Sequence, residues 1–204
     1  MNDTPNWEGP GLDAWEAWTP QQAAALLKGV DAPWCVVGGW AMDLFLGRET
    51  RKHDDLDIAI PRTSFQAMRT HLTGYRLHVV GDGEVRRLGA VAPLPDDRHQ
   101  CWVLDEEAGK WRMDVMSEPG DALKWVCRRD ERINAPREWM VGTSDDGIPF
   151  LVPEAVLLFK AKYCREKDEA DFAACLPELT APAKDWLRNA LDRVHPDHKW
   201  LERL

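Results

Sequence analysis

The sequence has no apolar run of about 18 residues, the shortest length that usually spans a membrane as a helix. Its first residues, Met-Asn-Asp-Thr-Pro-Asn-Trp-Glu, have neither the basic nor the apolar region of a secretory signal peptide. The 5 cysteines show no Cys-x-x-Cys spacing, which disfavours a zinc site or a redox motif. We therefore expect a cytoplasmic protein without a membrane partner, with reduced cysteines and no zinc.

The chain also lacks a positive net charge. Its formal charge is −9 at pH 7, which is the wrong sign for a protein that gains affinity by neutralising many phosphates. Nucleic acid is therefore disfavoured as a partner, although a local basic patch remains compatible with this total. The 204 residues, of which 44% are hydrophobic, suffice for one good core or for a main domain with a small appendage.

The most informative stretch begins with a short apolar run that ends in two glycines. Residues 35–37 are of the buried-strand type, and Gly38 and Gly39 accept φ > 0 and let another group approach the backbone. Residues 40–46 then carry apolar side chains at helical spacing, up to Gly47. The two glycines are thus predicted at a strand-to-helix turn, whose free N–H groups and dipole favour an anion such as phosphate.

A pair of aspartates follows this turn. Residues 55–60 alternate in character, which predicts a strand with Asp55 and Asp57 on one face. Two such carboxylates can bind the same hard cation, and Mg²⁺ accepts carboxylate oxygens together with substrate phosphates. The alternative is an exposed edge strand with two solvated aspartates. The Gly-Gly turn just before the pair favours the metal site.

These residues resemble a known signature. The Gly-Gly turn, the helix with Asp43 and the run Thr-Arg-Lys-His-Asp-Asp-Leu-Asp-Ile closely resemble the polymerase-beta-like nucleotidyltransferase superfamily, especially its aminoglycoside 2''-adenylyltransferases and lincosamide nucleotidyltransferases. The close match covers about a seventh of the chain. It implies that Asp55 and Asp57 hold two Mg²⁺ ions and that Gly38 and Gly39 meet the triphosphate. It also implies a third carboxylate on a later strand.

Asp114 is the candidate for that third carboxylate. Residues 100–104 and 110–116 flank a polar turn and predict a hairpin, with Asp114 among apolar neighbours on its second strand. A carboxylate there is unfavourable unless it is paired or metal-bound. The resemblance implies that it ligates metal and activates the acceptor hydroxyl as a general base. The alternative is an ion pair with Arg112 on a solvated face.

Three further residues match the pattern of the family. Arg51 and His53 stand in the polar loop before the carboxylates, which implies phosphate contact or organisation of the site; a lone histidine is otherwise most often structural. Lys160 lies on a predicted helix, and the resemblance implies that it faces the triphosphate. The alternative for Lys160 is a solvated helix face.

The expected fold class is α/β (α+β), with a polymerase-beta-like core of mixed sheet and flanking helices. We expect an irregular arm over residues 1–18, a nucleotidyltransferase domain over 19–150 and a helical unit over 151–204. The other helices are expected over 19–28, from 61 to about 73, from 153 to about 176 as one long helix, and over 183–194. A strand is expected over 75–80 and strand pieces over 138–142 and 148–151, with a loop from 84 to 98 and a solvated surface with balanced charges over 128–138.

The predicted reaction is Mg²⁺-dependent transfer of a nucleoside monophosphate, first of all AMP from ATP, to a hydroxyl of a small aminoglycoside- or lincosamide-like molecule, with release of pyrophosphate. Acidic clusters in loops at 96–97, 105–107 and 145–146 predict an acidic rim that attracts a cationic acceptor. Two alternatives stay open, a nucleotidyltransferase toxin that modifies tRNA or protein and a catalytically silent binding domain.

Overall fold

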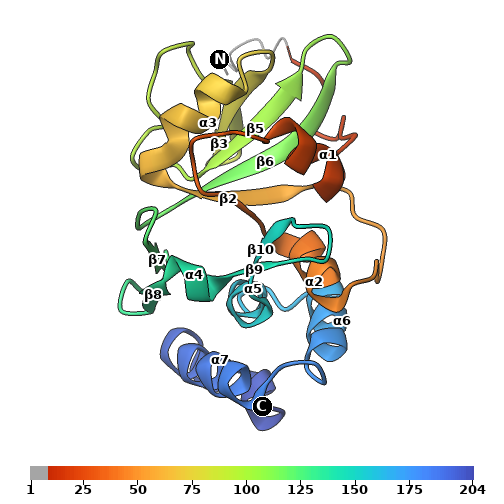
Figure 1. Ribbon diagram of the computed structural model, residues 1–204, viewed down its shortest axis with the longest axis vertical. Helices are drawn as coiled ribbons and strands as arrows, with labels where there is room; N and C mark the ends of the chain where they lie inside the picture. Colours follow the sequence, from red (N-terminus) through yellow and green to blue (C-terminus); the bar gives the residue numbers. More distant parts are fainter. Residues whose placement is uncertain (1–8) are drawn as a thin grey trace, which may run out of the picture.

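The protein is described by a computed structural model over residues 9–204; the first eight residues of the expected arm lie outside the described part. One mixed sheet of eight strands runs in the order β4-β3-β5-β6-β2-β1-β10-β9, and β7 pairs with β8 separately (Figure 1). The strands are β1 (Cys35–Val36), β2 (Asp57–Pro61), β3 (Arg76–Gly81), β4 (Glu84–Arg87), β5 (Gln100–Asp105), β6 (Lys110–Glu118), β7 (Lys124–Val126), β8 (Asn134–Pro136), β9 (Val141–Thr143) and β10 (Pro149–Leu151).

Within residues 9–204, seven α-helices accompany this sheet. They are α1 (Pro20–Leu26), α2 (Gly38–Leu46), α3 (Phe65–His71), α4 (Arg137–Met140), α5 (Pro153–Lys160), α6 (Glu166–Cys175) and α7 (Ala181–Val194), with short 3₁₀ turns η1 (Arg62–Ser64) and η2 (Lys199–Glu202). In Figure 1, α1 and α3 lie on the part of the sheet that contains β2 to β6, whereas α5, α6 and α7 lie together on the other side of β2. The expected α/β fold class with a mixed sheet is confirmed.

Local sequence signals fix the start of α1. Thr19 accepts a hydrogen bond from the backbone N–H of Gln22 at 3.2 Å, and the Gln22 side chain accepts one from the Thr19 N–H at 2.8 Å. This reciprocal capping satisfies two N–H groups that a helix end leaves free, and Pro20 suits the first helical position because it has no N–H. The predicted helix start is therefore confirmed.

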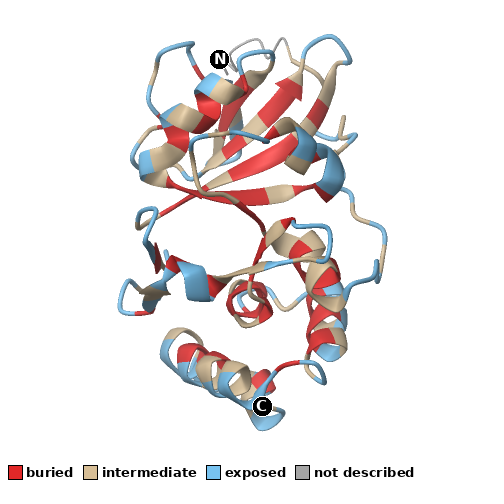
Figure 2. Cartoon of the chain, viewed as in Figure 1, coloured by how far each residue is buried: buried red, intermediate tan, exposed pale blue. Residues whose placement is uncertain are grey.

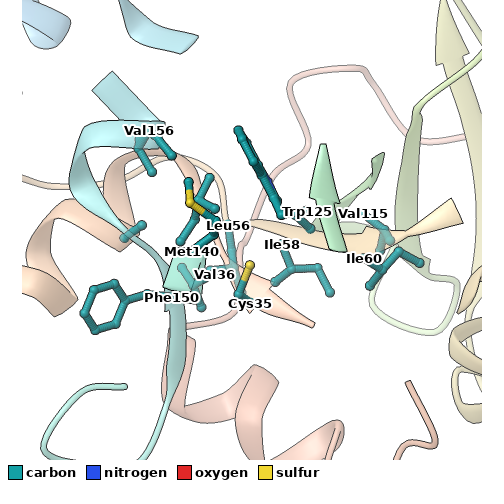
Figure 3. Packing of buried hydrophobic residues seen from close by; sticks show 14 of the residues in the cluster. Cys35, Val36, Leu56, Ile58, Ile60, Val115, Trp125, Met140, Phe150 and Val156 are labelled. Atoms are coloured by element: carbon teal, nitrogen blue, oxygen red, sulfur yellow. The ribbon is translucent and has the colours of Figure 1, made fainter. Parts of the chain in front are cut away.

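The core extends along the whole sheet, and one section of it lies where β1, β2 and β10 meet α5. Val36, Ile58 and Phe150 are buried there, and Figure 3 shows them in one cluster with Val156 and Trp125. Figure 2 shows the same pattern on a larger scale, with buried residues on the inner sides of the helices and along β2. Because β10 pairs with β1, the core continues across residue 150. The domain boundary expected between residues 150 and 151 stays a prediction.

Four sequence predictions are wrong in detail. The expected loop from residue 84 contains β4, because Asp82 and Gly83 have φ of 53° and 77° and close a hairpin with β3. The strand expected over 138–142 is α4 followed by β9. The long helix from 153 is two helices, since Cys164 has φ 47° and Asp168 caps α6 by accepting from the Arg165 N–H at 3.0 Å.

The fourth wrong prediction places Asp55 on the same strand as Asp57. β2 begins only at Asp57, and Asp55 is an exposed loop residue.

The described residues contain no helix long and apolar enough to cross a bilayer. The five cysteines are free, and Cys35, Cys101, Cys127 and Cys175 are buried.

Candidate active site

A cleft of about 670 Å³ opens between the carboxylate-bearing strands and the helices that follow β10. Its lining includes the start of α2, the loop before β2, alternate residues of β6 such as Asp114 and Met116, and residues from the α5–α6 region. Of the residues predicted for the site, seven line this cleft: Gly38, Gly39, Arg51, Asp55, Asp57, Asp114 and Lys160. The fold therefore gathers side chains that are up to 122 positions apart in the sequence, from Gly38 to Lys160.

The two strands place Asp57 and Asp114 side by side. β2 and β6 run parallel, and Asp57 is the direct cross-strand partner of Asp114. The Asp114 N–H donates to the Leu56 carbonyl at 2.8 Å, which fixes this register. Partners in adjacent strands project to the same face of the sheet, so both carboxylates face the cleft. Asp55 joins them from the loop and not from the pleat of a strand.

Asp114 is held on one oxygen and free on the other. Its Oδ2 accepts from Gln100 Nε2 at 2.8 Å and from Trp102 Nε1 at 3.1 Å. Its Oδ1 is buried and has no hydrogen-bond partner among the described residues. Arg112 pairs instead with Glu16 at 2.7 Å and with Asp105 at 3.1 Å, so the alternative of an Arg112–Asp114 ion pair is wrong.

The environment disfavours negative charge on these groups. Burial raises the pKa of Asp57 well above its usual range, and the carboxylates of Asp114 and Asp55 raise it further, while Lys160 and Lys167 oppose the shift. Burial also raises the pKa of Asp114 to about 6. Desolvated carboxylates close to one another are a donor set that a hard divalent cation would stabilise.

The donor set fits Mg²⁺ only in part. Over residues 9–204, no three His, Cys, Asp or Glu side chains converge closely enough to hold an ion by themselves. An ion at Asp57 and Asp114 would therefore take its remaining oxygens from water and from a bound phosphate, as Mg²⁺ commonly does. The unpartnered Asp114 Oδ1 is the atom most clearly available as a ligand.

The two glycines begin α2, where Gly38 lies against Asp57 and Gly39 lies against Arg51 and His53. Gly38 has φ 67°, and a Cβ at this position would lie 2.5 Å from Asp57 Oδ2. A Cβ on Gly39 would collide with the Arg51 guanidinium and would lie 2.7 Å from the His53 ring. Glycine is thus required here for close approach as well as for backbone conformation. The free N–H groups at this helix start suit an anion.

His53 connects the loop before β2 to α2 and lies outside the cleft. Its Nε2 lies 2.5 Å from Asp43 Oδ2, and its ring stacks on Trp40 with centroids 4.3 Å apart. Asp43 Oδ1 accepts from the Thr50 N–H at 3.1 Å. These contacts tie the loop before β2 to α2, and His53 is not among the residues that line the cleft. They favour the site-organising role over phosphate contact.

Lys160 and Arg51 both form an ion pair with Asp171 of α6. Lys160 Nζ lies 2.7 Å from Asp171 Oδ2 and 3.4 Å from Asp168 Oδ1. Arg51 Nε lies 3.3 Å from Asp171 Oδ1. Lys160 is only 9% exposed, so the alternative of a solvated helix face is wrong. The carboxylates of α6 hold both cations at the wall of the cleft.

Sequence reasoning missed most of the positive charge in the cleft. We call Lys160, Lys162, Arg165 and Lys167 the helical wall; the last three are exposed and line the cleft together with Arg128 and Arg129. The sequence predicted a solvated surface at 128–138. Arg128 is exposed as expected, but Arg129 is half-buried and Arg137 is buried, so the prediction is wrong for these two residues. No periodic signal marks this set, because Arg128 and Arg129 follow β7 whereas the other four cations lie in residues 160–167, where the break between α5 and α6 was not predicted.

The predicted acidic rim is also wrong. None of the clusters at 96–97, 105–107 and 145–146 lines the cleft. Asp96 lies 3.3 Å from Arg62, and Glu106 lies 2.9 Å from Arg76, so two of the clusters pair with arginines outside it. The cleft instead has carboxylates on its strand side and cations on its helical side.

Comparison with known proteins points to the same family as the motif. Residues 21–116 match the family described as aminoglycoside-2''-adenylyltransferase. A 2''-aminoglycoside nucleotidyltransferase of Klebsiella pneumoniae is 38% identical over 80 residues, which are 36% of this chain and 42% of that protein. A protein of the same name from Escherichia coli gives the same figures. The chain thus spans less than half the length of these curated relatives.

Two solved structures share the fold. The crystal structure of ANT(2'')-Ia in complex with adenylyl-2''-tobramycin has a TM-score of 0.55 at 17% identity and covers 85% of this chain and 95% of that one. The crystal structure of the lincosamide antibiotic adenylyltransferase LnuA, bound to lincomycin, has a TM-score of 0.53 at 22% identity and covers 78% and 95%. At these identities the likeness establishes the fold. The resemblance recognised in the sequence is confirmed.

Proposed function

We propose that this chain, a relative of the aminoglycoside 2''-adenylyltransferases with the polymerase-beta-like nucleotidyltransferase fold, transfers AMP from ATP to a hydroxyl of a small antibiotic-like molecule and releases pyrophosphate. The observation that supports this most directly is the pairing of Asp57 with Asp114 across parallel strands, opposite a cationic wall. An aminoglycoside is the first acceptor class, since the matching relatives are named for it, and a lincosamide is the second.

The charges of the cleft suit a nucleoside triphosphate. The helical wall and the N-terminus of α2 offer positive charge and free N–H groups to the phosphates. On the opposite side, Asp57 and Asp114 would share one Mg²⁺ ion and Asp55 would contribute to a second from its loop, with water and phosphate as the remaining ligands. When bound, Mg²⁺ would neutralise the crowded carboxylates and stabilise charge on the phosphate oxygens.

Asp114 suits the role of general base. Its Oδ2 is oriented by Gln100 and Trp102, which leaves Oδ1 to accept a proton from the acceptor hydroxyl. In this arrangement Asp57 serves as the main metal ligand, and Asp114 would both contact the ion and accept the proton through the same oxygen, Oδ1, which has two lone pairs.

The toxin alternative finds less support. The cations share a cleft of about 670 Å³ with the paired carboxylates, which suits a triphosphate beside a small acceptor, and the net charge of −9 disfavours a nucleic acid as the acceptor. The test is transfer of label from α-labelled ATP in Mg²⁺, with tobramycin, lincomycin and tRNA supplied separately. We expect label on a small molecule together with pyrophosphate release, and none with Asp57→Asn. Label on tRNA alone would overturn the proposal.

A further inference from the structure

The segment before α1 is fixed against the site. The Glu16 N–H donates to the Trp111 carbonyl at 3.1 Å, and the Trp111 N–H donates to the Ala14 carbonyl at 3.1 Å. The Trp111 indole N–H donates to the Gly11 carbonyl at 2.9 Å. β5 occupies one edge of β6, so this segment lies on the other edge, ahead of the point where β2 begins to pair. Trp15 is thereby held at a defined position.

Trp15 and Trp102 form an aromatic wall in the cleft. Both rings line it, and their centroids are 5.0 Å apart in an edge-to-face arrangement at 76°. Trp102 also packs edge-on against buried Trp111, with centroids 5.2 Å apart. Both Trp15 and Trp102 are only half-buried, so part of each indole remains accessible from the cleft. The aromatic wall is therefore backed by a buried ring and keeps an accessible face.

The aromatic wall ends at the candidate base. Trp102 Nε1 donates to Asp114 Oδ2, while Asp114 Oδ1 has no partner. A molecule resting on the indoles would therefore place its own hydroxyls beside a free carboxylate oxygen. The helical wall, with its positive charge, is the better place for phosphates. The uncharged indoles then remain for the second substrate.

We propose that Trp15 and Trp102 form the acceptor subsite, in which the apolar face of an amino-sugar ring lies on the indoles and a hydroxyl points to Asp114. Tryptophan offers a large apolar surface to ring C–H groups and attracts ammonium groups through its π-face. The inference rests on the proposed function and specifies which wall receives the acceptor. Trp15 lies outside the family match at residues 21–116, so half of the subsite comes from a segment that the match does not include.

The test is calorimetric binding of tobramycin in Mg²⁺ and a non-hydrolysable ATP analogue. We expect Trp15→Ala to weaken tobramycin binding about tenfold or more, and Trp15→Phe to restore most of the affinity, because stacking needs the ring. The dissociation constant of the ATP analogue should not change. Trp139→Ala is the matched control, since Trp139 is 69% exposed and does not line the cleft.

Three outcomes separate this inference from the proposed function. Unchanged tobramycin binding by Trp15→Ala, where the wild type binds it, would overturn the subsite and leave the function standing. Equal losses for tobramycin and the ATP analogue, with a fall in melting temperature, would assign Trp15 a structural role and would also overturn it. A wild type that binds the ATP analogue but neither tobramycin nor lincomycin would overturn the proposed acceptor class, and the subsite with it.

Discussion

Individual carboxylates in this protein occupy positions where their charge is unfavourable. Asp114 is 4% exposed and Glu118 is 6% exposed, and burial raises the pKa of each. Groups with strongly shifted pKa values in a cleft are more common at functional sites than elsewhere. The sequence predicted Asp57 and Asp114 because carboxylates at these positions can bind a metal ion. No motif around Glu118 predicts that this carboxylate is buried.

Replacing Asp57 tests the metal assignment. Asp57→Asn removes a charged ligand without creating a cavity, so we expect turnover to fall at least about 1000-fold while the fold is retained. Without Mg²⁺ its melting temperature should equal or exceed that of the wild type, because the substitution relieves repulsion with Asp114 and Asp55. Turnover and thermal unfolding in the presence and absence of Mg²⁺ measure both effects. Wild-type turnover would show that Asp57 holds no essential ion.

Replacing Asp114 tests the base. Asp114→Asn keeps the shape of the side chain but cannot accept a proton at neutral pH, so we expect at least about a 100-fold fall in kcat with a small change in the KM for ATP. Steady-state kinetics with ATP and tobramycin give both values. Asp145→Asn, in an exposed loop, is the control. An equal fall for control and variant, or a change in the KM for ATP alone, would contradict the assignment.

At the scale of elements, the sequence predicted what local chemistry determines. The capped start of α1, the hairpin of β5 and β6 and the Gly-Gly turn each have a short-range cause. The break between α5 and α6 was not predicted, because apolar residues keep a helical spacing across residues 153–176. Glycine usually indicates a left-handed helix end, but the residue in that conformation here is Cys164. The place of Trp15 beside β6 depends on tertiary pairing, which no local pattern records.

The turn into α2 allows a comparison of two glycines with similar backbone conformation. Gly38 and Gly47 have φ of 67° and 65°, so alanine at either position costs about 1–2 kcal/mol of stability. Only at Gly38 would the new Cβ meet Asp57, whereas nothing lies within 4 Å of it at Gly47. We expect Gly38→Ala to lose at least about 100-fold in kcat/KM and Gly47→Ala to remain active. Equal activity of the two variants would show that the close approach of Gly38 to Asp57 is not needed for activity.

At the scale of the whole molecule, charge is distributed very unevenly. The total is −9, yet one side of the cleft carries Lys160, Lys162, Arg165 and Lys167. A sum over the sequence excluded a broad basic surface but could not show this local one, because the four cations stand in one short run of an acidic chain, and only the fold brings that run to the cleft beside Arg128 and Arg129. The same limit applies to the acidic clusters, which the sequence placed at the rim and the fold places elsewhere.

The buried carboxylates should also control how the stability of the whole chain depends on pH. Burial raises the pKa of Glu118 from 4.5 to about 7, although Arg137 and Trp125 oppose the shift. The folded state therefore binds a proton at Glu118 more tightly than the unfolded state does. This contribution to stability is complete below about pH 4.5 and is lost as the pH rises through about 7, with a total of about 3 kcal/mol at most.

Glu118→Gln isolates this effect, because glutamine has the shape of the protonated side chain and does not titrate. We expect the variant to exceed the wild type in free energy of unfolding by up to about 3 kcal/mol at pH 8 and to match it near pH 4. Urea denaturation across this range measures the difference, with Glu138→Gln, on an exposed residue, as the control. A difference that is the same at both ends of the range would mean that Glu118 does not change its proton affinity on folding, and that Arg137 compensates its burial in full.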